Sequence, residues 1–155
     1  MTVYIESLDE VTSIHGKTIE VSGGGVNGII SLSSLEAALE HVKNDIYYPE
    51  FVDKLTHLFY VANKRHCFQD GNKRIAISLG ALFLLKNGYL FVIERFLHKM
   101  EVISYQLAAG RIEKEFLREI IQSVIYEDDY SEDIKLRLIA CISNDEDNTT
   151  QDENN

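Results

Sequence analysis

The stretch Asn72-Lys-Arg-Ile-Ala-Ile-Ser-Leu-Gly-Ala-Leu-Phe-Leu-Leu-Lys86 decides the fold that we predict for this chain. Its apolar residues cover much of a helix's circumference, as in a helix enclosed by neighbours on several sides. Asn87-Gly88 follows directly, and a glycine after the last turn commonly ends a helix in the left-handed conformation. We therefore place a helix over residues 72–86 at the centre of the core.

Other stretches with helical apolar spacing or helix-start signals surround this segment. They are residues 8–15, 33–42, 48–65, 96–109, 113–126 and 131–142. Thr18 to Ser31 differs, because two short β-prone runs enclose a glycine-rich centre that suits a small hairpin or a plain connector. The sequence predicts an all-α, compact, single-domain helical bundle with a small β-hairpin flap.

The net charge of −10 is unevenly distributed. Residues 144–155 hold five acids, no Lys or Arg and no apolar residue, so we expect an acidic disordered tail after a folded domain over residues 1–143. The domain then carries about −5, which argues against nucleic acid as a partner because phosphate-backbone binding needs a basic face. A DNA-binding regulator is disfavoured for two reasons: this net negative charge, and the apolar, buried character that we predict for the central helix.

The chain shows no signal for export or for a membrane. Its two cysteines, Cys67 and Cys141, form no CxxC pair, and no basic N-terminal region precedes an apolar run. The longest apolar stretch, near Ala81 to Leu85, is too short to cross a bilayer. We expect a cytoplasmic protein with no membrane partner.

Residues 66–74, His-Cys-Phe-Gln-Asp-Gly-Asn-Lys-Arg, lie where the central helix begins. A helix start has N–H groups without acceptors inside the helix, and it carries positive dipole charge, so it attracts phosphate. Gly71 permits close backbone approach, and Lys73 and Arg74 add positive charge. The segment therefore predicts a phosphate-binding site.

Two further groups on this segment suit phosphoryl transfer. Asp70 is a hard oxygen ligand for Mg²⁺, and His66 titrates near neutrality, so it can accept a proton from a hydroxyl. Each has an ordinary structural alternative, since Asp70 could cap the helix and His66 could be a core or capping residue. Their combination on one short loop favours a catalytic site.

The segment resembles the signature of the Fic/Doc (Fido) family, H-x-F-x-[D/E]-G-N-[G/K]-R, and fills every defined position. The resemblance covers about Tyr4 to Tyr126. It extends to the family's opening helix at Leu8 to His15, and to its target-binding flap. The flap positions are Gly23, Gly24, Gly25, Val26, Asn27 and Gly28.

The resemblance implies a role for each motif residue. His66 would be the base for a target-protein hydroxyl, Asp70 the Mg²⁺ ligand, Gly71 and Asn72 the anion hole and phosphate-positioning groups, Lys73 and Arg74 the phosphate-binding cations, and Phe68 the buried loop anchor. The implied cofactors are ATP and Mg²⁺. The implied partners are a protein substrate and a cognate antitoxin.

Two positions depart from the AMP-transferring branch of the family. Lys73 replaces a glycine of that branch's signature, and Ile77 replaces its second arginine. Both resemble the Doc (death-on-curing) toxin subgroup of toxin–antitoxin modules, which implies phosphate transfer from Mg-ATP to a protein hydroxyl, with elongation factor Tu as the implied target. Fic-type AMP transfer to a protein Ser, Thr or Tyr is the alternative, followed by a non-catalytic binding module.

Other candidate sites are weaker. Adjacent residues on a loop seldom face one another, which disfavours a Cys67–His66 nucleophile, and His41, His57 and His98 lack the spacing of a zinc site. Fic proteins that inhibit themselves often carry the motif [S/T]-x-x-x-E-[G/N]. Residues 149–154 match this motif, and residues 123–128 miss it at the last position. We expect an antitoxin in trans rather than self-inhibition.

Overall fold

The computed structural model describes the backbone of residues 1–21, 31–65 and 71–153, and the side chains of residues 1–17, 31–65 and 71–143. The α-helices are α1 (Leu8–Val21), α2 (Ser33–His41), α3 (Phe51–Lys64), α4 (Asn72–Lys86), α5 (Ile93–Ala108), α6 (Lys114–Tyr126) and α7 (Glu132–Glu153), with a short 3₁₀ helix η1 (Leu90–Val92) before α5. The described residues form no strand. The predicted all-α class is confirmed.

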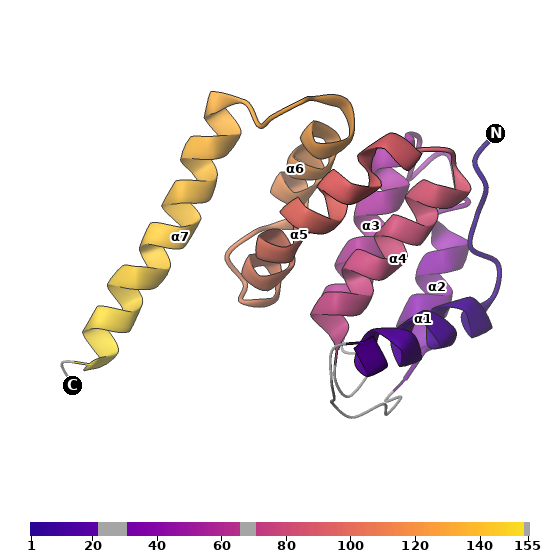
Figure 1. Ribbon diagram of the computed structural model, residues 1–155, viewed down its shortest axis with the longest axis horizontal. Coiled ribbons are helices and arrows are strands. Elements are labelled where there is room, and N and C mark those ends of the chain that lie inside the picture. The colour runs from indigo at the N-terminus through magenta and orange to yellow at the C-terminus, as the bar shows by residue number, and fades with distance from the viewer. Residues whose placement is uncertain (22–30, 66–70, 154–155) are drawn as a thin grey trace.

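Helix α4 lies at the centre of the bundle, as its sequence predicts (Figure 1). It packs against α3 and α5, while α1 crosses it on another side. Its residues Ile75, Leu79 and Phe83 are fully buried, and they follow the helical spacing of one continuous face. The predicted bounds of this helix are confirmed at both ends.

The ends of α4 are set by two glycines with positive φ. Gly88 adopts φ +84°, which confirms the predicted left-handed end, and Gly71 adopts φ +81° at the start. Beside Gly88, the Asn87 amide donates to the Phe83 carbonyl at 2.8 Å and to the Val3 carbonyl at 2.9 Å. The C-terminal end of α4 therefore also holds the N-terminal segment at Val3.

Helix α3 begins with a capping box that the sequence analysis did not identify. Glu50 is the N-cap, and its backbone N–H donates to the Asp53 carboxylate at 3.0 Å. Arg118 of α6 donates to the carboxylates of both acids, which ties this helix start to α6. The start of α3 thereby lies near the C-terminal end of α4, where Phe51 stacks on Phe83 and Tyr89.

The described residues of the predicted hairpin region, 18–21 and 31, form no strand. Residues 18–21, its expected first arm, are helical and continue α1 to Val21. β-propensity is a weak preference that a helix already packed on α4 overrides. The flap positions Gly23 to Gly28 lie outside the described residues, so their target-binding role stays a prediction.

Helix α7 leads away from the bundle beside α6 (Figure 1). Arg137 forms an ion pair with Glu119 at 2.8 Å and lies 4.1 Å above the Phe116 ring, and Cys141 Sγ donates to the Arg111 carbonyl at 3.2 Å. The backbone of α7 continues through the acidic segment to Glu153, beyond the expected helix end near residue 142. The proposed domain boundary at residue 143 stays a prediction.

Candidate phosphate site at the start of helix α4

The described part of the site is the first turn of α4, and Gly71 is its N-cap. The Gly71 carbonyl accepts the first helical hydrogen bond from the Ile75 N–H at 2.8 Å. A left-handed φ at this position suits glycine, because a Cβ would be strained there. The turn that follows carries the predicted residues Asn72, Lys73 and Arg74.

Lys73 is exposed, whereas Gly71, Asn72 and Arg74 are half-buried. The structure therefore brings these four predicted residues together at one helix start, where the dipole adds positive charge. His66, Phe68 and Asp70 lie outside the described residues, so their roles as base, anchor and metal ligand stay predictions. Arg65, the C-cap of α3, and Gly71 are the described residues on either side of them.

A buried polar network joins this helix start to α3 and α5. The Asn63 amide of α3 donates to the Ser104 hydroxyl at 2.8 Å and to the Ser104 carbonyl at 3.0 Å. The Ser104 hydroxyl in turn donates to the Lys73 carbonyl at 2.7 Å. Sequence analysis did not identify this network, although the polar Asn63 directly after the apolar Val61 and Ala62 was a signal that could have indicated it.

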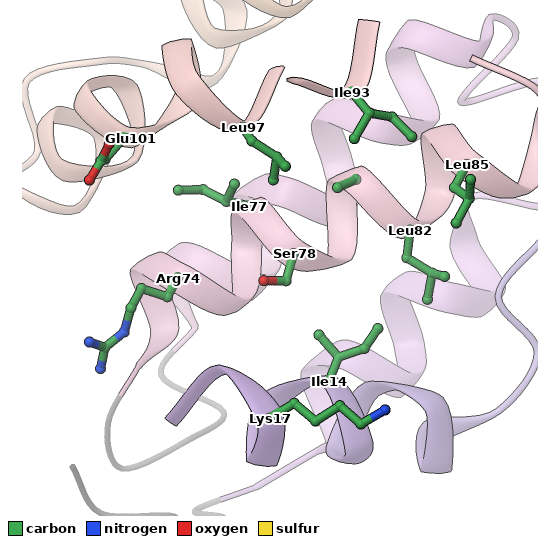
Figure 2. Close-up of a pocket in the computed structure, with 11 residues that line it drawn as sticks. Ile14, Lys17, Arg74, Ile77, Ser78, Leu82, Leu85, Ile93, Leu97 and Glu101 are labelled. Atoms are coloured by element: carbon green, nitrogen blue, oxygen red, sulfur yellow. The ribbon is translucent and has the colours of Figure 1, made fainter. Parts of the chain in front are cut away.

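An apolar groove of about 590 Å³ runs along α4 between α1 and α5. Ile77, Leu82, Leu85 and Leu97 line much of it, and Arg74 lies at the end nearest the α4 N-terminus (Figure 2). Ile77, on the next turn after Arg74, presents an apolar side chain to this groove.

Three charged residues also line the groove. These are Lys17 of α1, Arg74 of α4 and Glu101 of α5. The groove therefore combines a long apolar floor with one cation of the predicted phosphate site, Arg74, at one end.

His57 belongs to a second polar cluster, between α3, α6 and the segment after α2. The Lys114 amine lies 2.8 Å from His57 Nδ1, and the Tyr48 hydroxyl lies 3.3 Å from the same nitrogen. Burial, followed by the charge of Lys114, lowers the pKa of His57 to about 4. His57 is therefore neutral at pH 7, so its Nδ1 can accept a hydrogen bond from the Lys114 ammonium.

Within the described residues, no group of three His, Cys, Asp or Glu side chains is placed to hold a metal ion. None of the helices in the described ranges has the length and apolarity needed to cross a membrane. Both statements leave out residues 66–70, where the predicted Mg²⁺ ligand Asp70 lies.

The fold and the described site define an all-α domain with a glycine-capped, cationic helix start. The Fic/DOC family matches residues 5–84, slightly more than half of the sequence. The chain belongs to the Fic/DOC family.

Among curated proteins, the chain is similar to the protein kinase Doc of Escherichia phage P1. The two are 33% identical over 85 residues, which are 53% of this chain and 67% of that protein. No solved structure matches the chain. The family match and the similarity to the phage kinase together support a Doc-like protein-modifying transferase.

Proposed function

We propose that this protein is a Doc-like toxin that transfers phosphate from Mg-ATP to a hydroxyl of a target protein, and so blocks translation or growth. The observation that carries the proposal is the first turn of α4, where Gly71 caps a helix whose next residues are Asn72, Lys73 and Arg74. A helix start with two adjacent cations suits a nucleotide's phosphates. The similarity to the phage P1 kinase supports phosphate as the transferred group.

In the proposed reaction, the target's hydroxyl oxygen attacks the γ-phosphorus, and the bond between that phosphorus and the β–γ bridging oxygen breaks. His66 accepts the hydroxyl proton, and ADP leaves. Arg74 and the first-turn N–H groups of α4 hold phosphate oxygens, while Asn72 orients them. Elongation factor Tu is the target that we propose to test first.

The proposed Mg²⁺ ligand is Asp70, one residue before Gly71. A carboxylate beside a phosphate-binding helix start suits magnesium, which is commonly held by one or two carboxylates together with the phosphates. The ion would supply positive charge that neutralises the phosphate oxygens. Lys73 and Arg74 provide the protein's own positive charge at the same helix start.

AMP transfer is the second candidate function. The observation against it is Ile77, which presents an apolar side chain to the groove one turn after Arg74, where the AMP-transferring branch has a second arginine. Ile77 at this position resembles the Doc subgroup, and that resemblance favours phosphate transfer. Lys73 does not separate the two reactions, since lysine also occurs at this position in members that transfer AMP.

ATP labelled separately at the α- and γ-phosphates tests the function. The protein is incubated with purified elongation factor Tu, or with bacterial lysate, and the label on protein is measured. Label from the γ-position alone supports kinase activity, whereas label from the α-position shows AMP transfer. His66→Ala should remove labelling and keep the helical circular dichroism spectrum. A folded wild-type protein that neither binds Mg-ATP nor labels any protein would instead be a binding module.

We further propose a cytoplasmic location, since ATP and translation factors are cytoplasmic, and a cognate antitoxin as partner. The apolar groove beside Arg74 is the surface that we assign to the antitoxin. A helix with an apolar face fits a groove of this kind, and an occupant would reach Arg74 at the phosphate site.

A further inference from the structure

Asn63 and Ser104 form a buried hydrogen-bonded bridge to the phosphate site without being part of it. Asn63 is 2% exposed, and Ser104 is 1% exposed. The Ser104 hydroxyl accepts a hydrogen bond from Asn63 Nδ2 at 2.8 Å and donates its own hydrogen to the Lys73 carbonyl at 2.7 Å. These three groups lie on α3, α5 and α4, so one hydroxyl connects three helices.

The bridge acts on the backbone of the proposed anion-binding turn. Lys73 is the second residue of α4, and its carbonyl belongs to the turn that carries Asn72 and Arg74. The hydroxyl therefore holds the main chain of this turn, and leaves the Lys73 side chain exposed. The first turn is where a helix meets a bound phosphate.

The other end of the bridge lies close to the predicted base in sequence. Asn63 is on the last turn of α3, three residues before His66. The next residue, Lys64, also contacts α5, because its amine donates to the Leu107 carbonyl at 2.9 Å. Helix α5 is thus bonded to the last turn of α3 and to the first turn of α4.

We infer that Asn63 and Ser104 are positioning residues, which set where the first turn of α4 lies relative to the end of α3. This inference rests on the proposed function. Buried hydrogen bonds in a chain are geometrically strict, since a misplaced member leaves polar groups unpaired away from water. A shift of about 1 Å in a substrate-positioning group can lower a rate by on the order of a hundredfold.

The test compares two buried serine hydroxyls. Ser104→Ala removes the hydroxyl of the bridge. Ser123→Ala is the matched control, because Ser123 is 2% exposed on α6 and its hydroxyl has no hydrogen-bond partner within the described part of the chain. The KM for ATP and kcat are measured for both variants, with phosphate transfer to the target as the readout and calorimetric Mg-ATP binding beside it.

We expect Ser104→Ala to raise the KM for ATP on the order of tenfold or more, and Ser123→Ala to leave it within about twofold. A merely structural role would reduce the folded fraction, and hence the apparent kcat, but would leave KM unchanged in the molecules still folded. Ser104→Cys fills the site with a thiol, which is slightly larger than the hydroxyl and a weaker donor, so it supplies the same comparison if the alanine variant does not fold.

Arg74→Ala separates the two ways of failing. If Arg74→Ala raises the KM for ATP and neither Ser104 variant does, the positioning role is wrong and the phosphate site stands. If Arg74→Ala leaves Mg-ATP binding unchanged, the proposed function itself is wrong. An increase in KM in the Arg74 and Ser104 variants but not in Ser123→Ala supports both.

Discussion

His57 lies half-buried on α3, with the Lys114 amine 2.8 Å from its Nδ1 and the Tyr48 ring stacked at a tilt 4.6 Å away. Lys114 also lies above the Tyr48 and Tyr60 rings, at 5.8 and 5.4 Å from their centroids. Burial lowers the pKa of both His57 and Lys114. This cluster therefore keeps the His57 imidazole neutral at a pH between about 4 and 6.5, where a histidine in water would be protonated.

His57 should make the protein less stable as the pH falls. Its pKa is about 4 in the folded chain and about 6.5 in the unfolded chain. Above pH 6.5 it is neutral in both states and has no effect. As the pH falls from 6.5 to 4, the unfolded chain takes up a proton that the folded chain excludes, so the free energy of unfolding decreases.

Urea unfolding at pH 7.5 and pH 5 measures this effect, with His57→Gln as the comparison. The difference between the two pH values should be smaller in His57→Gln than in the wild type. Asp129 does not affect this comparison, because it changes stability at lower pH. Hydrogen bonds, that of Lys135 first, and nearby charge lower its pKa to about 2, so the stability that it contributes is lost only below about pH 4. Equal pH dependence in the two proteins would contradict the assignment to His57.

At the scale of elements, the contact between α4 and α5 depends on a glycine. A Cβ placed on Gly80 would lie 2.7 Å from Cζ of Phe96, whose ring is fully buried. The Phe96 ring also meets Phe59 of α3 edge-on, at 6.2 Å between centroids. The three central helices therefore share one ring that has little room to move.

Gly80→Ala should destabilise the protein by about 1 to 3 kcal/mol, because the added methyl overpacks this contact. Gly88→Ala should cost about 1 to 2 kcal/mol for another reason, its positive φ, since nothing lies within 4 Å of its Cβ position. Urea unfolding distinguishes the causes. Phe96→Leu should offset part of the Gly80→Ala cost and none of the Gly88→Ala cost, and additive effects at Gly80 and Phe96 would contradict the overpacking.

The groove between α1, α4 and α5 allows a test of the antitoxin surface. Leu97 of α5 lines it and is 44% exposed, so Leu97→Glu can be accepted without unfolding. We expect this change to weaken neutralisation by the antitoxin, because a carboxylate would be buried in an apolar contact. Growth of cells that express the variant with its cognate antitoxin is the measurement.

Leu136→Glu on α7 is the matched control for Leu97→Glu. Leu136 is 64% exposed and does not line the groove. Both variants should stay toxic without the antitoxin, and only Leu97→Glu should escape neutralisation. Full neutralisation of Leu97→Glu would place the antitoxin elsewhere.

At the scale of the whole molecule, the two halves of α7 differ in their packing and in their charge. Its first half is tied to α6 through Arg137, whereas the acidic segment from residue 144 on holds half of the net negative charge. A polar segment of this composition has little apolar area to bury, so we expect it to contribute little to stability.

Removal of residues 144–155 should change the melting temperature by less than about 2 °C. Transfer activity should also be unchanged, because the first turn of α4 and its contacts to α3 and α5 are kept. Thermal unfolding and the labelling assay measure both effects. Removal of residues 132–155 is the comparison, since it also removes the Arg137 contacts to Glu119 and Phe116 and should lower the melting temperature more. A large loss from the shorter deletion would contradict the boundary at residue 143.

The sequence by itself determined the features that depend on neighbours along the chain. The bounds of α4, the glycines at its two ends and the cations of its first turn follow from local spacing and backbone preference. The motif over residues 66–74 also sufficed for the family resemblance, because each position is defined by its own residue type. The expected first arm of the hairpin was wrong, because local β-propensity did not prevent α1 from continuing to Val21.

Only the tertiary structure decided which distant residues meet. Asn63 and Ser104 are 41 positions apart, and His57 and Lys114 are 57 positions apart, so no local pattern pairs them. The groove likewise needs α1, α4 and α5 packed together before its lining exists. Helix formation is governed by local preference, whereas these contacts follow from how buried faces pack, which a pattern along one helix does not specify.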